Sequence, residues 1–346
     1  PDLGHEGDNE AGGYEAGGLL YDHGREKMSE LLLPDGRKLP LDRALIMGVL
    51  NVTPDSFSDG GLYFRTEDAV RRAEEMAQEG ADIIDIGGES SRPGAEPVPL
   101  EEELRRVIPV VREVARRLSV PISVDTYKAE VARRALEEGA SIVNDISALR
   151  FDPDMAEVVA RRRAPVVLMH MKGTPRDMQR NPYYEDVLGE VEGFLKERKE
   201  AAVGMGIPEG NIILDAGIGF GKRVQDNLQL LKNLDRLVAL GSPVLVGTSR
   251  KSFIGAVLDL PVEERLEGTL TTLVLAVAKG AKILLLDEPF YGLDHQSAIK
   301  MGEIIGNLVK DIRHTTRAAV IVSHRLDYLM NLCDRIYVMD LSLIHI

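Results

Sequence analysis

The chain has 346 residues, of which 44% are hydrophobic and 28% charged, which is typical of a globular protein with a large core. Its 42 basic and 56 acidic side chains give a net charge of −14, so general binding to nucleic acid or to an anionic membrane surface is not expected. The single cysteine, Cys333, excludes an internal disulfide framework and favours a reducing, cytoplasmic location. No apolar run reaches the roughly 18 residues of a transmembrane helix.

The first 30 residues differ in composition from the rest of the chain. They hold eight acidic residues, two basic residues and seven glycines, with almost no apolar periodicity. Such a segment cannot offset its ordering entropy by burial, so we expect a disordered tail over residues 1–30. Met28 is a candidate natural start, in which case the first 27 residues are leader sequence.

A hairpin and then a regular alternation of strands and helices are predicted from Leu31 onward. The turn signal Pro34–Arg37 lies between two short apolar runs, which favours a hairpin over residues 31–41. Eight Val- and Ile-rich runs come next, each too short for a helix: Ala44–Asn51, Ala81–Gly87, Pro121–Thr126, Ser141–Ile146, Pro165–Met171, Asn211–Gly217, Pro243–Thr248 and Lys282–Asp287. Helical patterns lie between them, such as Thr66–Gly80, Leu100–Leu118 and Val224–Leu240. Thr66-Glu67-Asp68 has the chemistry of a helix start and Gly80 that of a helix end.

Eight strand–helix repeats predict an α/β fold with a parallel sheet, because parallel strands need crossover connections. The strands are apolar along their whole length, which indicates that both faces of the sheet are covered. Eight such units in about 250 residues match a (β/α)8 TIM barrel. A doubly wound open sheet is the alternative.

Polar residues follow seven of the predicted strands at their carboxyl ends, where a barrel carries its functional groups. The segments are 51–61, 88–95, 123–126, 144–147, 169–171, 215–217 and 247–252. A single Asp or Asn at such a position is often only a helix N-cap. Capping does not explain seven consecutive strand ends, so we expect a binding site at this end of the barrel.

These side chains suit a phosphorylated heterocycle. Asp125, Asn144 and Asp215 offer carboxylates and an amide to a planar ring with several N–H donors. Loop cations suited to phosphate are Arg92, Arg250 and Lys251. Asn51, with Asp55 or Asp59, provides hard oxygen ligands for Mg²⁺.

The motifs at the strand ends resemble those of dihydropteroate synthase, the folate-pathway enzyme that sulfonamides inhibit. The resemblance covers about residues 31–281 and is carried by NVTPDSFSDGG, GESSRPGA, SVDTYK, NDIS, LMHMKGTP, DAGIGFGK and GTSRKS. It implies a TIM barrel that forms a homodimer. It also implies a transferase that joins 6-hydroxymethyl-7,8-dihydropterin pyrophosphate to p-aminobenzoate, with Mg²⁺, releasing pyrophosphate and 7,8-dihydropteroate.

The resemblance implies a role for each matching position. Residues that would contact the pterin are Asp125, Asn144, Met169, Asp215 and Lys251. Residues that would form the p-aminobenzoate slot are Phe57, Ser91, Pro93 and Ser252, with Ser252 opening a helix toward the carboxylate. The catalytic side chains would be Lys251, Asp59 and Arg92, where Arg92 binds an anion and Asp59 stabilises positive charge on the pterin methylene. Asn51 would bind the metal.

The eighth strand departs from the family. The family carries an Arg-Val-His triplet that binds the pyrophosphate, whereas Leu285 and Asp287 occupy the Arg and His positions in this chain. A lost cation and an added carboxylate beside a pyrophosphate predict an activity several-fold lower or more. Smaller departures are Ser91 in place of Thr and DAGIGFGK in place of DPGFGFGK.

From Lys282 onward the chain resembles a second family. ILLLDEP at 283–289 with YGLD at 291–294 resembles the Walker B motif and D-loop of an ABC-type ATPase, and AVIVSH at 319–324 resembles its switch-histidine strand. The sequence has no Walker A motif, so ATP hydrolysis is not expected. We therefore expect a barrel over 31–281 and a chimeric segment over 282–346. Residues 282–312 of that segment supply strand and helix eight.

Two other functions stay open at this point. A methyltetrahydrofolate methyltransferase also uses a pterin-binding barrel, but its chemistry releases no pyrophosphate and does not need the GTSRKS and loop-one motifs. A non-catalytic pterin-binding module or a nucleotide-binding fusion is the third possibility.

Overall fold

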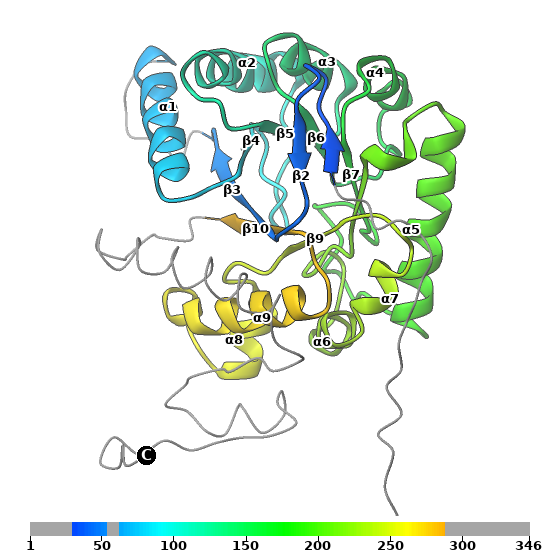
Figure 1. Ribbon diagram of the computed structural model, residues 1–346. Helices are drawn as coiled ribbons and strands as arrows, with labels where there is room; N and C mark the ends of the chain where they lie inside the picture. Colours follow the sequence, from blue (N-terminus) through cyan, green and yellow to red (C-terminus); the bar gives the residue numbers. More distant parts are fainter. Residues whose placement is uncertain (1–29, 54–61, 288–346) are drawn as a thin grey trace, which may run out of the picture.

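Eight parallel strands form a closed barrel in the computed structural model, which describes residues 30–53 and 62–287, with only the backbone described at 62–65 (Figure 1). The strand order is β10-β3-β4-β5-β6-β7-β8-β9. The strands are β3 (Leu45–Asn51), β4 (Ile83–Gly87), β5 (Ile122–Asp125), β6 (Ile142–Asp145), β7 (Val166–Met169), β8 (Ile212–Asp215), β9 (Val244–Gly247) and β10 (Ile283–Asp287). The predicted TIM barrel is confirmed, and the open-sheet alternative is wrong because β10 pairs with β3.

Helices surround the barrel, as Figure 1 shows. They are α1 (Leu62–Gln78), α2 (Leu100–Arg117), α3 (Ala129–Glu137), α4 (Met155–Arg162), α5 (Val187–Gly204), α6 (Val224–Lys232), α7 (Asp235–Val238), α8 (Ser252–Leu258) and α9 (Leu266–Ala278). Two short 3₁₀ helices lie at Glu209–Asn211 and Val262–Glu264. In the described part of the chain, no helix is long and apolar enough to span a membrane.

The side chains of each strand alternate between the helices and the barrel interior, because successive residues of a strand point to opposite faces. In β4, for example, Ile84 and Ile86 belong to the large core under the helices, whereas Ile83 belongs to a separate interior cluster. The strand residues of that interior cluster are Leu45, Met47, Ile83, Ile142, Val167, Ile213, Leu245 and Ile283. Most of them come from early positions of their strands, so this cluster fills the amino-terminal end of the barrel.

An antiparallel hairpin closes the amino-terminal end. Its strands are β1 (Glu30–Leu32) and β2 (Lys38–Pro40), which confirms the hairpin predicted from the turn at Pro34–Arg37. Leu31, Leu33 and Leu41 pack into the interior cluster. The Asn211 side chain holds the hairpin in place, since its Oδ1 accepts from the Leu32 backbone N–H at 3.2 Å and its Nδ2 donates to the Leu32 carbonyl at 2.9 Å.

Two helix boundaries differ from the prediction. The first helix begins at Leu62, four residues before the predicted start, so Thr66 lies inside α1; residues 62–65 contain no helix breaker, and the helix continues through them. The segment predicted as one helix over Val224–Leu240 is divided into α6 and α7. Asn233 ends α6, and its side-chain amide donates to the Gln229 carbonyl at 2.8 Å, an interaction that competes with continuation of the helix.

The eighth strand completes the barrel although it begins the segment that was expected to be foreign. β10 pairs in parallel with β3 over its whole length and with β9 over three residues. The predicted strand eight is therefore confirmed. The expected helix eight, the rest of the segment to 346 and the N-terminal tail to residue 29 lie outside the described residues.

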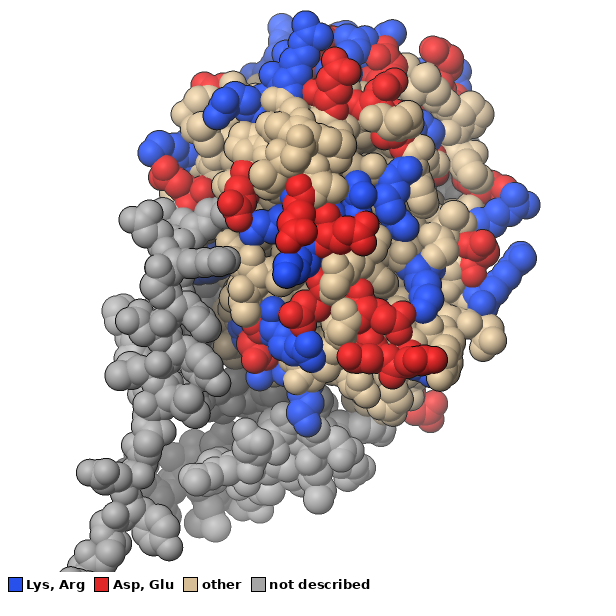
Figure 2. All heavy atoms as spheres, turned by 90° about the vertical axis from the view of Figure 1, so that its right-hand side faces the viewer, with Lys and Arg blue, Asp and Glu red and all other residues tan. Residues whose placement is uncertain are grey.

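Acidic and basic side chains are interspersed over most of the face shown in Figure 2, and basic side chains adjoin one another along its upper edge. Ion pairs such as Arg236–Glu192, at 2.6 Å, join neighbouring elements. The expectation that the chain does not bind nucleic acid, drawn from its net charge, stays a prediction.

The packing of β10 gives a stability prediction. Leu284 is 1% exposed and packs in the core under the helices, whereas Leu32 in the hairpin is 42% exposed. We expect Leu284→Ala to lower the free energy of unfolding by about 2–5 kcal/mol because a cavity is left. The matched Leu32→Ala variant should lose less than about 1 kcal/mol. Urea denaturation measures both, and equal losses would contradict the role of β10 in closing the barrel.

Candidate active site

The strand register brings the predicted polar residues into one layer at the carboxyl end of the barrel. Asn51 pairs with Gly87, Gly87 with Asp125, and Asp125 with Asn144 across β3, β4, β5 and β6. Alternation directs these positions, and the ends of β7, β8 and β10 with them, into the barrel. The interior residues at the ends of those three strands are Met169, Asp215 and Asp287.

The floor of this site on β4, β5 and β6 is acidic and buried. The Asn144 side-chain amide donates to Asp85 Oδ2 at 3.0 Å. Asp85 is only 1% exposed, and its Oδ1 has no hydrogen-bond partner among the described residues. Burial raises the pKa of Asp85 to about 6. Burial, and then the charge of Asp85, raise the pKa of Asp125 well above its usual range, so this floor takes up a proton readily.

A lysine faces a third carboxylate across the site. The Lys251 Nζ donates to the Ile218 carbonyl and lies 4.8 Å from the centre of the Phe220 ring. Burial lowers the pKa of Lys251 to about 8, and Asp215 opposes that shift. Burial also raises the pKa of Asp215, while Lys251 lowers it. These two residues therefore favour each other's charged forms.

An apolar cluster lies beside these charges. Met169 is buried and packs with Ile146, Met171 and Met178, and the partly buried Phe220 packs against the cluster. Thioethers and an aromatic ring provide a flat, adaptable contact for a planar ligand. Carboxylates, an amide and a lysine next to an apolar surface are the groups that orient a heterocycle.

The loop after β4 is held at both ends by one carboxylate. Glu89 accepts from the Val98 backbone N–H at 3.0 Å and from the Tyr127 hydroxyl at 2.6 Å. Lys128 forms ion pairs with both Glu89 and Glu103. Because Glu89 and Val98 bracket the segment, these contacts fix the base of the loop while the residues between them remain accessible.

The remaining predicted residues lie at the mouth or outside the described chain. Within the loop after β4, Ser91 is partly buried, and the Arg92 side chain, at 79%, and Pro93 are exposed. Ser252 is exposed and is the first residue of α8, as predicted. Phe57 and Asp59 lie outside the described residues.

Asp287 lies at the mouth between two residues that were predicted to bind anion and metal. Its Oδ1 accepts from the Asn51 side-chain amide at 3.2 Å, and its Oδ2 lies 3.4 Å from the Arg92 guanidinium. Its backbone N–H donates to the Ser249 hydroxyl at 3.1 Å. Leu285, two residues earlier, packs against the interior apolar cluster. The structure thus places a carboxylate, rather than a cation, beside Arg92.

The oxygen atoms of Asn51 and Asp287 fit a hard divalent cation in part. Among the described residues, no group of three or more His, Cys, Asp or Glu side chains could hold a metal. Mg²⁺ often binds through one or two protein oxygens and completes its octahedron with water and substrate phosphates. Asn51 therefore suits a metal that arrives with a phosphate ligand.

Three residues of the site were not predicted. Asp85 stands in an apolar strand run, and a carboxylate at an interior position was the available signal. Glu89 belongs to a motif that was recognised, but its role depends on contacts with Tyr127 and Lys128, which follow β5, and the sequence does not reveal these contacts. Lys222 was assigned only to a glycine-rich segment, although it is buried beside the site.

Comparisons with known proteins agree with this geometry. A family model described as "Pterin binding enzyme" matches residues 47–287. The chain is 50% identical over 253 residues to a dihydropteroate synthase of Haemophilus influenzae, covering 73% of this chain and 92% of that protein. It is 53% identical over 243 residues to a dihydropteroate synthase of Bacillus subtilis, covering 70% and 83%.

Solved structures give the same result. A Xanthomonas albilineans dihydropteroate synthase with 4-aminobenzoic acid has a TM-score of 0.72 and 46% identity, covering 80% of this chain and 98% of that one. A structure of the enzyme from that organism in complex with 7,8-dihydropteroate has a TM-score of 0.68 and 43% identity, with the same coverage. The comparisons do not support the resemblance of residues 282–340 to an ABC-type ATPase.

The buried carboxyl of Asp85 predicts a pH dependence of stability. Since its pKa is raised to about 6 in the folded chain, the proton is held more tightly there than in the unfolded chain. This contribution is present below about pH 4 and is lost as the pH rises through about 6. We expect Asp85→Asn, which cannot ionise, to be more stable than the parent chain by about 1–3 kcal/mol near neutral pH.

The difference should disappear toward about pH 4, as measured by urea denaturation across this range. Asp154→Asn, at an exposed position, serves as the matched control and should follow the parent chain throughout. A lower stability of Asp85→Asn at neutral pH would contradict the assignment of a costly buried charge.

Proposed function

The chain belongs to the dihydropteroate synthase family of pterin-binding enzymes, and we propose that its barrel joins 6-hydroxymethyl-7,8-dihydropterin pyrophosphate to p-aminobenzoate. The layer of Asp125, Asn144 and Asp215 beside Met169 and Lys251 is the observation that carries this proposal. These groups match a flat ring with several N–H donors on its edge. The products would be 7,8-dihydropteroate and pyrophosphate.

The acidic floor would recognise the pterin through its hydrogen-bond donors. Asp125 is easily protonated without a ligand because of burial and the nearby Asp85. Ring N–H groups that donate to Asp125 would favour its ionised form, so pterin binding and loss of this proton would be coupled. Lys251 would donate to an acceptor on the same ring, while Met169 contacts its face.

The reaction exchanges one bond for another at the pterin methylene. The bond from this carbon to the pyrophosphate oxygen breaks, and the amine nitrogen of p-aminobenzoate forms the new bond and loses a proton to water. The nearby carboxylates Asp125 and Asp215 would stabilise positive charge on the pterin as the bond breaks. Arg92 would bind the departing anion. We keep Phe57, Ser91, Pro93 and Ser252 as the proposed p-aminobenzoate slot and Asp59 as a further stabilising carboxylate.

Mg²⁺ stays a proposal, with Asn51 as its ligand on this chain. A bound Mg²⁺ would neutralise charge on the pyrophosphate. Asn51 lies near the proposed anion ligand Arg92, because Asp287 contacts both the Asn51 amide and the Arg92 guanidinium. A homodimer, a cytoplasmic location and inhibition by sulfonamides are proposed from the family alone.

The two alternative functions are less well supported. A methyltransferase would not need Arg92 at the mouth, since no pyrophosphate leaves. A non-catalytic module would bind a pterin without releasing pyrophosphate. A pyrophosphate-release assay with both substrates separates these possibilities, because only the proposed enzyme requires p-aminobenzoate for release.

We expect Lys251→Ala and Asp125→Ala each to lower turnover at least about tenfold, equivalent to a loss of about 1.4 kcal/mol of transition-state stabilisation. Each removes a charged group from the proposed pterin contact. Pyrophosphate release measures the effect. Lys196→Ala and Asp154→Ala change the same residue types at exposed positions and should retain the parent rate. Near-native rates in Lys251→Ala or Asp125→Ala would overturn the site assignment.

The mouth of β10 gives a second prediction. Asp287 repels a pyrophosphate and pairs with the arginine expected to bind it. We expect Asp287→Asn to raise pyrophosphate release, and Leu285→Arg combined with Asp287→His to raise it further, by several-fold in total. Steady-state rates at saturating p-aminobenzoate test this order. An unchanged rate in both variants would show that Asp287 does not oppose the anion.

A further inference from the structure

Lys222 is a buried cation that the proposed reaction does not use. The side chain is 4% exposed. Its Nζ donates to the carbonyls of Gly217 at 2.9 Å, Phe220 at 3.0 Å and His170 at 3.2 Å, and lies 3.0 Å from His170 Nδ1. A buried ammonium group is costly unless it is fully hydrogen-bonded, so this set of contacts indicates a defined role.

The carbonyls that Lys222 binds belong to a tight turn after β8. The Phe220 backbone N–H donates to the Gly217 carbonyl at 2.9 Å, closing the turn over residues 217–220. The turn is pressed against the end of β7, because Gly217 has φ +64° and a Cβ there would lie 1.9 Å from the His170 carbonyl oxygen. Lys222 therefore joins two neighbouring loops at their closest approach.

The same turn contacts the Lys251 side chain and positions it. Its Ile218 carbonyl accepts from the Lys251 Nζ, and its Phe220 ring lies under that ammonium group. At Gly219, an added Cβ would lie 2.9 Å from the Lys251 Cδ, so the aliphatic chain passes directly over this residue. The turn also donates its Gly217 N–H to Asp215 Oδ1 at 2.7 Å. One turn thus orients both charged groups of the pterin contact on this side.

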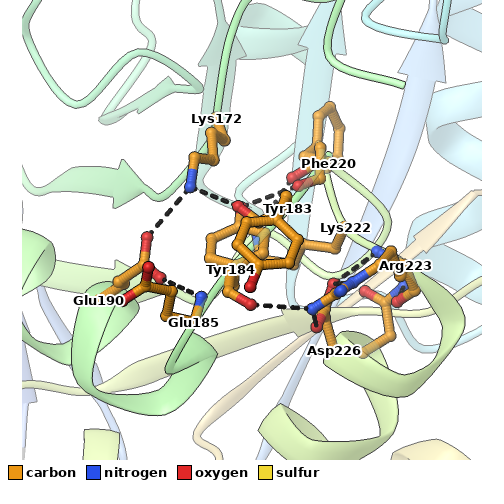
Figure 3. A network of polar contacts seen from close by, with 11 residues as sticks. Lys172, Tyr183, Tyr184, Glu185, Glu190, Phe220, Lys222, Arg223 and Asp226 are labelled. Carbon is orange, nitrogen blue, oxygen red and sulfur yellow. Dashed lines mark hydrogen bonds and ion pairs between the residues drawn. The ribbon is translucent and has the colours of Figure 1, made fainter. Parts of the chain in front are cut away.

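A second network contacts Gly221, the residue that follows the turn. The Tyr184 hydroxyl donates to the Gly221 carbonyl at 2.8 Å. Figure 3 shows this network, in which Arg223 joins the Tyr184 carbonyl to Asp226 beside Lys222. Tyr184 supports the same loop one residue after the turn through a neutral hydrogen bond, which makes it a control for the charge of Lys222.

The charged groups around Lys222 connect it to the site electrostatically. Burial and Lys251 lower the pKa of Lys222, to about 7, whereas Asp215 and Asp226 raise it. Lys222 in turn lowers the pKa of Asp215, against the effect of burial. Burial and the neighbouring Lys222 lower the pKa of His170 to about 2, so this imidazole stays neutral.

We propose that Lys222 is a positioning residue for pterin binding. It holds the 217–220 turn against the end of β7 and thereby orients Lys251 and Asp215 toward the heterocycle. This inference rests on the proposed function. Lys222 itself touches neither substrate, so its removal should weaken pterin binding more than it affects p-aminobenzoate.

The test measures binding of 6-hydroxymethyl-7,8-dihydropterin pyrophosphate by calorimetry for the full chain and for Lys222→Met, which keeps the length but removes the charge. We expect the Kd to rise at least about tenfold, because buried carbonyls lose their donor and the turn relaxes. The KM for p-aminobenzoate should change less than about threefold, a split that a general loss of stability would not give. Without the Lys222 charge, the pKa of Asp215 should rise. The loss of pterin affinity on acidification should therefore begin at a higher pH than in the parent chain.

Tyr184→Phe removes a neutral hydrogen bond from the same loop and should keep both the affinity and the pH profile. Equal losses in Lys222→Met and Tyr184→Phe with an unchanged pH profile would overturn the proposal, as would parent-like pterin binding by Lys222→Met. If Lys222→Met does not fold, Lys222→Gln, which keeps two N–H donors without charge, is held to the same pH criterion. Failure of the parent chain itself to bind the pterin would overturn the proposed function together with this inference.

Discussion

The closed parallel barrel fixes which side chains can meet at the site. In a closed sheet every strand must alternate between the helices and the interior, so the parity of a residue decides its environment. At the strand ends, four polar side chains point into the barrel interior: Asn51, Asp125, Asn144 and Asp215. The strand register aligns the first three of them in one row. A shift of one residue in any strand would turn its polar group into the apolar layer under the helices.

Charge is distributed unevenly around the resulting pocket. On one side Asp85 and Asp125 share a buried environment that favours a proton, and on the other Lys251 and Lys222 surround the single carboxylate of Asp215. Burial therefore raises the pKa values of the acids Asp85, Asp125 and Asp215 and lowers those of Lys251 and Lys222. A ligand with N–H donors facing Asp125 favours the ionised carboxylate, and an acceptor facing Lys251 favours the charged ammonium group. Ligand binding is therefore linked to the uptake and release of protons by these residues.

The sequence predicted the strands well because their signal is local. Each run of Val and Ile marks a strand buried on both faces, and all eight were found within two residues of the predicted bounds at each end. The start of α1 and the break at Asn233 were missed, because weak local preferences decide them. Asp125 and Asp215 could be predicted from their places after strands. Glu89 and Lys222 could not, since their partners come from other elements and only the folded chain shows them together.

The hairpin at the amino-terminal end of the barrel affects how substrates enter and products leave. Leu31, Leu33 and Leu41 pack into the interior cluster at the amino-terminal end, so in the described part of the chain we expect reactants to enter at the opposite mouth. Both reactants and both products share that passage. Pyrophosphate bound by Arg92, as proposed, would lie nearer the mouth than the pteridine product. Exit is therefore expected to be ordered, and a retained dihydropteroate would compete directly with the next molecule of pterin.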